Sequence, residues 1–131
     1  MVKQSKPCVV AVVDDDIRVR ESVGDLLASA GFEARLFHSA EEFMNASDLE
    51  PSCCLITDVR MPGMDGWELQ RLAMQKFPKL PVVFITAHQD DETRNRAMDL
   101  GAVAALYKPF DGEELLAIVD MAIGKYQASQ T

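Results

Sequence analysis

The sequence has few cysteines, the residues that form disulfides in small proteins and bind thiophilic metals. Its 131 residues include three cysteines, Cys8, Cys53 and Cys54, and no pair of them has CxxC spacing. An odd number of cysteines, two of them adjacent, argues against a disulfide framework and against a structural zinc site. We interpret the cysteines as small apolar core residues of a protein in a reducing compartment.

Positive charge and long apolar runs are also scarce. Thirteen Lys and Arg residues stand against 21 Asp and Glu, which gives a formal net charge of −8. This balance argues against binding to nucleic acid or to an anionic membrane by bulk electrostatics. No apolar run approaches the roughly 18 residues of a membrane-spanning helix. The apolar run at 8–13 is too short for a signal peptide and ends in aspartates. We therefore expect a cytoplasmic protein.

The chain does contain a regular alternation of short apolar runs and helical patterns, without internal repeats. Hydrophobic residues make up 48% of the chain and charged residues 26%, as in ordinary globular domains. The pattern predicts strands at residues 8–13, 32–37, 53–57, 82–85 and 103–107. Helical spacing follows each of them, at about 19–30, from 39, and at 67–77, 90–100 and 112–123. Such alternation predicts a doubly wound (βα)5 α/β fold with a parallel five-stranded sheet and helices on both faces.

Polar residues follow the predicted strands at their carboxyl ends. Asp14, Asp15 and Asp16 come after the first strand, and Asp58, Thr86 and Lys108 come after the third, fourth and fifth. In a parallel sheet these ends share one edge, so we expect the side chains to converge there. Clustered carboxylates repel one another, and a divalent cation relieves that repulsion. Oxygen ligands of this kind favour Mg²⁺, or Mn²⁺, over zinc.

The remaining groups at this edge suit a phosphoryl ligand. Lys108 offers a compact positive charge, and the Thr86 hydroxyl can donate a hydrogen bond. A carboxylate nucleophile, a metal site and a cationic side chain together predict phosphoryl transfer to an aspartate.

Four segments closely resemble the bacterial response-regulator receiver domain. They are VVDDD at 12–16, DVRMPGMDG at 58–66, VFITA at 83–87 and YKPF at 107–110. The resemblance covers residues 9–123, nearly the whole chain, and implies a three-layer flavodoxin-like fold with strand order 2-1-3-4-5. We expect the domain to span 7–126, with 1–6 and 127–131 as flexible tails. Arg60, Phe110 and the Thr86-x-His88 pattern are most similar to regulators of the nitrogen-fixation and nodulation type.

The resemblance also implies a metal-binding role for several acidic residues. Asp58 would be the phosphoacceptor. Asp15, Asp58 and the backbone carbonyl of Arg60 would hold Mg²⁺ directly, and Asp14 would act mainly through water. Asp16 would extend the acidic pocket, and it is also suited to cap the following helix.

Other implied roles concern the end of the fifth strand. Thr86 would bind a phosphoryl oxygen, and Lys108 would pair first with Asp58 and then with its phosphate. The Lys108–Pro109 peptide bond would be cis. The chain departs from the family at Ala105, where receivers usually carry an aromatic switch residue. Tyr107 should point to the opposite side from Lys108, since neighbouring residues of a strand alternate in direction.

The function implied is that of a phosphoacceptor in two-component signalling. A sensor histidine kinase or phosphotransfer protein would supply the phosphoryl group, and the resulting switch would control an output domain or partner. The domain would not be a turnover enzyme, although it would support its own phosphotransfer and autodephosphorylation. Homodimerisation through the fourth helix, fifth strand and fifth helix is a further possibility, with Leu106 and Tyr107 as candidates. We expect no direct binding to nucleic acid.

Two alternatives remain at the sequence level. The Asp14-x-Asp16 pattern after the first strand also fits a phosphatase of the haloacid-dehalogenase type, but no cap domain and no late acidic pair accompany it. An interaction module that uses the fold without phosphorylation is the other alternative, and Ala105 is compatible with it.

Overall fold

The computed structural model describes residues 9–46, 52–87 and 90–129. The strands are β1 (Val9–Val13), β2 (Glu33–Phe37), β3 (Cys54–Asp58), β4 (Val82–Thr86) and β5 (Ala104–Tyr107). The helices are α1 (Ile17–Ser29), α2 (Ala40–Ala46), α3 (Gly66–Lys76), α4 (Asp91–Asp99) and α5 (Gly112–Ser129). Cys8, His88 and the predicted tail at 1–6 lie outside the described residues.

The strands form one parallel sheet in the order β2-β1-β3-β4-β5, as predicted. The central strands β1, β3 and β4 are buried along their whole length, because their β-branched and apolar side chains are covered on both faces. Strand β2 lies at an edge, where its polar residues Glu33 and Arg35 are tolerated.

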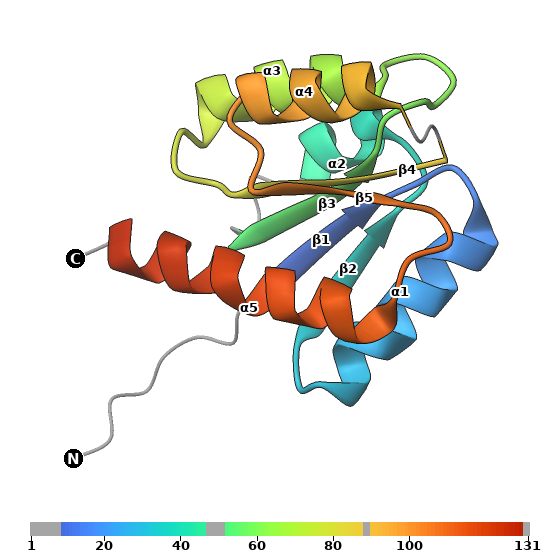
Figure 1. Cartoon of the computed structure of the whole chain (residues 1–131), viewed down its shortest axis with the longest axis vertical. Coiled ribbons are helices and arrows are strands. Elements are labelled where there is room, and N and C mark those ends of the chain that lie inside the picture. Colours follow the sequence, from blue (N-terminus) through green and yellow to red (C-terminus); the bar gives the residue numbers. More distant parts are fainter. Residues whose placement is uncertain (1–8, 47–51, 88–89, 130–131) are drawn as a thin grey trace.

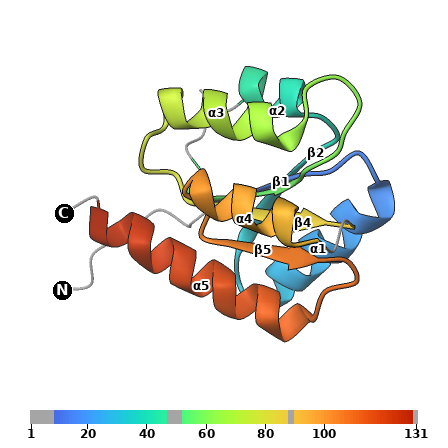
Figure 2. The ribbon, with the colours of Figure 1, turned by 45° about the horizontal axis from the view of Figure 1, so that its top comes forward.

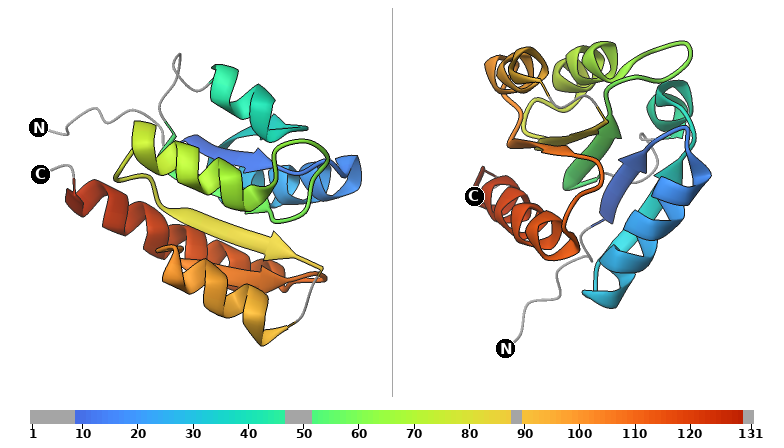
Figure 3. Two further views of the ribbon diagram at one scale, coloured as in Figure 1. Left: turned by 90° about the horizontal axis from the view of Figure 1, so that it is seen from above. Right: turned by 45° about the vertical axis from the view of Figure 1, so that its right-hand side comes forward.

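Helices cover both faces of the sheet and make three layers. Helices α2, α3 and α4 lie on one face, and α1 and α5 lie on the other (Figure 1; Figure 3, right). Each face has its own apolar core. Phe43, Leu69 and Phe84 belong to the first, and Leu27, Ile56 and Leu115 to the second. Figure 2 shows α4 lying beside the edge strand β5.

Aspartate side chains cap the start of four of the helices. Asp16, Asp65 and Asp90 accept hydrogen bonds from backbone N–H groups in the first turns of α1, α3 and α4. Asp111 does the same at the start of α5, where its Oδ1 accepts the Glu113 N–H at 3.0 Å. These caps fix the direction in which each helix leaves the carboxyl-terminal edge of the sheet. The helices that follow these strand ends therefore start with a first-turn N–H group already partnered, at the edge of the sheet expected to carry the polar residues.

The last helix is longer than the sequence pattern indicated. Helix α5 continues to Ser129, so residues 127–129 are helical and do not form the tail that we predicted from residue 127. Lys79 Nζ donates a hydrogen bond to the Ser129 carbonyl at 2.8 Å, which gives a terminal carbonyl of α5 a partner. Within the described ranges, no helix is long and apolar enough to cross a bilayer.

Candidate functional site

Three aspartates meet at the carboxyl ends of β1 and β3. Carboxylate oxygens of Asp14, Asp15 and Asp58 lie within 4.8 Å of one another. The two strands are neighbours, with Val13 paired to Thr57, so the residues that follow them emerge side by side. The convergence predicted from the strand ends is therefore present for Asp14, Asp15 and Asp58.

Asp14 is fully buried, and its polar groups are held by neighbouring elements. Its backbone N–H donates to the Phe37 carbonyl at 3.1 Å. Its Oδ1 accepts the Asp16 N–H at 2.9 Å, and its Oδ2 accepts Lys108 Nζ at 2.9 Å. Asp15, by contrast, is exposed at the mouth of the cluster.

Asp58 ends β3 and is also buried. Its Oδ1 accepts the Val59 N–H at 2.7 Å, and its Oδ2 accepts Lys108 Nζ at 3.2 Å. Burial raises the pKa of the Asp58 carboxyl, and the negative charge of Asp14 raises it further, against the opposing effect of Lys108. The site therefore holds this carboxylate in an environment that favours pairing with a cation.

Lys108 is the cation that the chain itself supplies. Burial alone would lower the pKa of its ammonium, but the hydrogen bonds and charges of Asp14 and Asp58 outweigh burial and raise the pKa. Its backbone N–H donates to the Thr86 carbonyl at 2.7 Å, and the Lys108–Pro109 bond is cis, as predicted. Thr86 is fully buried as the last residue of β4.

The cluster fits a hard divalent cation. Three carboxylates and one ammonium leave two negative charges when all are ionised, and every donor is an oxygen. Those are the ligands that Mg²⁺ prefers. Asp15 and Asp58 could hold it, with the Arg60 backbone carbonyl as the third ligand that the resemblance implies. Lys108 contacts one carboxylate oxygen of Asp14 and one of Asp58.

Asp16 caps helix α1, as its position before the helix predicted. It accepts the Arg18 N–H at 2.9 Å as N-cap of α1, and its carboxylate also pairs with the Arg18 guanidinium at 3.4 Å. The side-chain hydrogen bond from Arg18 lowers the pKa of Asp16. Among the described residues, Asp16 is not part of the carboxylate cluster.

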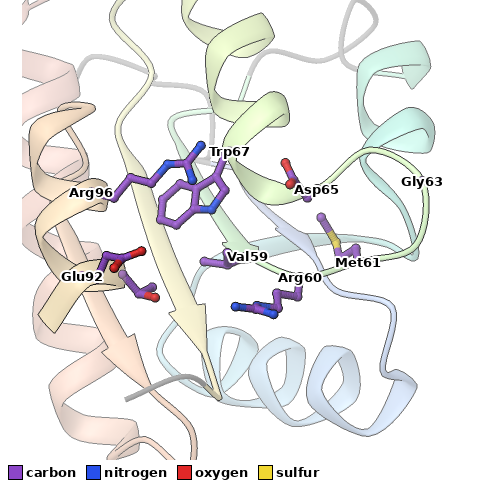
Figure 4. Close-up of a pocket in the computed structure, with 9 residues that line it drawn as sticks. Val59, Arg60, Met61, Gly63, Asp65, Trp67, Glu92 and Arg96 are labelled. Atoms are coloured by element: carbon purple, nitrogen blue, oxygen red, sulfur yellow. The ribbon is translucent and has the colours of Figure 1, made fainter. Parts of the chain in front are cut away.

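A hollow of about 420 Å³ lies beside the cluster, between the segment after β3 and helix α4 (Figure 4). Trp67 lies in its wall, with the Arg96 guanidinium 4.6 Å from the ring centroid and the Phe84 ring at 4.9 Å. This contact between α3, α4 and β4 was not predicted. The only indication in the sequence was a tryptophan at the start of a helix next to the Asp58 segment.

Strand β5 differs from the usual receiver pattern in the way the sequence indicated. Ala105 pairs in register with Phe84 and packs on the face covered by α3 and α4, where it fills little space. The Tyr107 hydroxyl donates to the Asp90 carbonyl at 3.1 Å, at the start of α4. Tyr107 and Lys108 thus contact different elements, as the alternation along a strand predicted.

Comparison with known proteins gives consistent matches. Residues 10–120 match the model of the response regulator receiver domain. The chain is 43% identical over 115 residues to the transcriptional regulatory protein FixJ of Bradyrhizobium diazoefficiens, covering 87% of this chain and 56% of FixJ. It is 40% identical over 115 residues to nodulation protein W of the same organism, covering 88% of this chain and 51% of that protein.

Solved structures agree with these matches. A structure described as the BeF3-activated receiver domain of DrrB superposes with a TM-score of 0.83 at 30% identity, covering 91% of this chain and 99% of that chain. The chain spans about half the length of FixJ and of nodulation protein W, and 25% of the NtrC regulator of Klebsiella pneumoniae.

Proposed function

The chain belongs to the response regulator receiver domain family of two-component systems, and we propose that it accepts a phosphoryl group on Asp58 in the presence of Mg²⁺. The observation that carries the proposal is the position of Asp58. Its carboxylate lies in a cluster with Asp14 and Asp15 and receives a hydrogen bond from Lys108 at 3.2 Å.

The residues around Asp58 prepare one of its oxygens for reaction. The Val59 N–H holds Oδ1 at 2.7 Å, which fixes the plane of the carboxylate. Oδ2 faces Lys108 and is the oxygen that we expect to attack phosphorus. The new bond joins Oδ2 to phosphorus as the bond from phosphorus to the donor's histidine nitrogen breaks. Bound Mg²⁺ would supply charge neutralisation of the phosphoryl oxygens.

Transfer would change which groups Lys108 and Thr86 contact. In the structure, Lys108 is shared between Asp14 and Asp58. A phosphoryl group on Asp58 offers Lys108 stronger acceptors, and we expect the buried Thr86 to move toward the same oxygens. Thr86 pairs with Tyr107 of β5, and Lys108 directly follows that strand, so the two arrangements would favour different positions of β5.

The partners follow from this chemistry. The donor would be a sensor histidine kinase or a phosphotransfer protein, and the recipient of the signal an output domain or a partner protein. A homodimer through α4, β5 and α5 is supported by the exposed apolar residues Met98, Leu100 and Met121. The net charge of −8 supports the absence of direct nucleic-acid binding by this domain.

Intact-mass spectrometry after incubation with acetyl phosphate tests the proposal. We expect one added phosphoryl group in the presence of Mg²⁺ and none in its absence. Asp58→Asn should abolish the adduct. Asp65→Asn is the matched control, because Asp65 lies in the same connection but caps α3, and it should retain the adduct.

Rapid hydrolysis could hide the adduct, so a second measurement uses a stable phosphoryl mimic. Beryllofluoride with Mg²⁺ should change the fluorescence of Trp67, which lies in the hollow next to Arg60. An adduct or a beryllofluoride response that survives in Asp58→Asn would refute the assignment. The absence of both in the unmodified protein would favour a module that does not use phosphorylation.

A further inference from the structure

Arg20 makes a contact with the acidic cluster that the proposed chemistry does not use. It lies on α1, and its Nη1 donates a hydrogen bond to the backbone carbonyl of Asp14 at 2.7 Å. Its own backbone N–H donates to the Asp16 carbonyl at 3.1 Å, within the first turn of the helix. Arg20 is half-buried, so its side chain is tied to this segment and not free in solvent.

This contact completes the fixation of Asp14. The Asp14 N–H and both of its carboxylate oxygens already have partners, in Phe37, Asp16 and Lys108. The carbonyl belongs to the peptide group that joins Asp14 to Asp15. Holding that carbonyl fixes the plane of the peptide, and so the direction from which the exposed Asp15 leaves the chain.

We propose that Arg20 is a positioning residue for Mg²⁺, which sets the place of Asp15 through the Asp14 carbonyl. The inference rests on the proposed function, because it assumes that the cluster of Asp14, Asp15 and Asp58 binds Mg²⁺. Groups that orient metal ligands without touching the metal typically change affinity about 10–100-fold when removed.

The positive charge of Arg20 and its hydrogen bond to the Asp14 carbonyl should have opposite effects on Mg²⁺ affinity. A guanidinium near the cluster repels a cation, so removing its charge should strengthen Mg²⁺ binding if charge is its main effect. Removing it should weaken Mg²⁺ binding if it holds the peptide group in place. The sign of the change therefore separates the two roles.

Arg18 provides the matched control on the same helix. Its side chain is 87% exposed and contacts the Asp16 carboxylate at 3.4 Å, so it carries the same charge without holding the Asp14 carbonyl. Arg18→Met should leave Mg²⁺ affinity nearly unchanged or slightly raised.

The experiment is a titration of the purified chain with Mg²⁺, followed by Trp67 fluorescence and by calorimetry. We expect Arg20→Met to bind Mg²⁺ at least about tenfold more weakly than the unmodified chain. Arg20→Lys keeps the positive charge and a hydrogen-bond donor, so its Mg²⁺ affinity should lie between those of Arg20→Met and the unmodified chain. It also serves as the second variant should Arg20→Met fold poorly.

Titration with Ca²⁺ separates positioning from a general loss of structure. Mg²⁺ requires near-octahedral geometry at short distances, whereas Ca²⁺ accepts more variable arrangements. Displacing Asp15 should therefore weaken Mg²⁺ binding more than Ca²⁺ binding, and the ratio of the two affinities should fall in Arg20→Met. Unchanged or tighter Mg²⁺ binding, or an equal loss for both ions, would overturn the inference. Absence of Mg²⁺ binding by the unmodified chain would instead remove the proposed function.

Discussion

Lys108 is closer to Asp14 than to the phosphoacceptor candidate: its Nζ lies 2.9 Å from the Asp14 carboxylate. The distance to Asp58 is 3.2 Å. Asp14 is fully buried while the Lys108 side chain is 20% exposed, so the ammonium bridges an interior acid and a pocket that solvent reaches. The Lys108 ammonium thus offsets the negative charge of the two carboxylates when no metal is bound. It can turn toward a phosphoryl group when Asp58 carries one.

Removing this bridge should destabilise the metal-free protein. Lys108→Met leaves two neighbouring carboxylates without their cation, and breaking a buried ion pair costs about 3–5 kcal/mol. Because Lys108 is partly exposed, we expect a decrease of about 2–3 kcal/mol in the free energy of unfolding. Urea denaturation without Mg²⁺ measures it, with Lys125→Met on the exposed side of α5 as a control. Equal stability of the two variants would contradict the prediction.

The raised pKa of Asp58 predicts how metal-free stability depends on pH. The folded state holds the Asp58 proton more tightly than the unfolded chain does, because of burial and then the charge of Asp14. The stabilisation from this proton is fully present below the ordinary pKa of an aspartate and is lost as pH rises through the raised value. Ionised Asp58 therefore weakens the fold at neutral pH.

Asp58→Asn should accordingly be more stable than the unmodified chain at neutral pH without Mg²⁺, and the difference should vanish in acid. Urea midpoints across a pH series measure both effects. Asp65→Asn, which changes a helix cap outside the cluster, controls for the replacement of an aspartate by asparagine in the same connection. A constant difference between Asp58→Asn and the unmodified chain at every pH would show that ionisation of Asp58 is not the cause.

The convergence of Asp14, Asp58 and Lys108 could be predicted because it depends on topology alone. The apolar runs predicted the strands, and their alternation with helices predicted a parallel sheet. In a parallel sheet, the carboxyl ends of the strands lie at the same edge. The strand order itself came from the family resemblance. The alternating polarity of 33–37 also identified an edge strand, because only an edge tolerates it.

Contacts between long side chains could not be predicted in the same way. The Arg20 guanidinium reaches the Asp14 carbonyl, and Arg96 reaches Trp67, through flexible side chains whose partners depend on distances between elements. Nothing in the local sequence distinguishes Arg20 from the exposed Arg18. The end of α5 at Ser129 was missed for a related reason. Lys79 donates a hydrogen bond to the Ser129 carbonyl, and Lys79 is distant from Ser129 in the sequence.

Tyr107 should hold the start of α4 against β5. Tyr107→Phe removes the hydrogen bond from its hydroxyl to the Asp90 carbonyl, an exposed contact at 3.1 Å. The expected loss of stability is about 0.5–1 kcal/mol, since the bond competes with water. Hydrogen exchange in the first turn of α4 should become faster. Tyr126→Phe on α5 is the control, and the same acceleration there would mean that the effect is not local.

Arg96 should fix α4 against α3 through Trp67. Arg96→Met removes the cation that lies 4.6 Å from the indole centroid and should reduce stability by about 1 kcal/mol. The emission of Trp67, which is the single tryptophan, should shift as well. Arg94→Met lies on the same helix and is exposed, so it should change neither property. An unchanged Trp67 spectrum in Arg96→Met would show that the contact does not persist in solution.

Gly66 should be intolerant of any side chain, because α3 begins against the backbone of the phosphoacceptor candidate. A Cβ at this position would lie 2.2 Å from the Asp58 carbonyl oxygen and 2.9 Å from the Val59 Cα. Neither backbone atom can rotate away, and the Gly66 N–H also donates to the Val59 carbonyl at 2.7 Å. Gly66→Ala must therefore displace β3, α3 or both.

We expect Gly66→Ala to lower the free energy of unfolding by about 2 kcal/mol or more and to weaken Mg²⁺ binding, because Asp58 moves with its backbone. Gly124→Ala is the matched control. A Cβ there meets no atom within 4 Å, and alanine in a helix interior is favoured over glycine by about 1 kcal/mol, so this variant should be more stable. Thermal unfolding and Mg²⁺ titration of the pair separate the clash from the general effect of adding a methyl group. If Gly66→Ala kept full stability and Mg²⁺ affinity, the start of α3 could not be packed as closely against Asp58 as the structure has it.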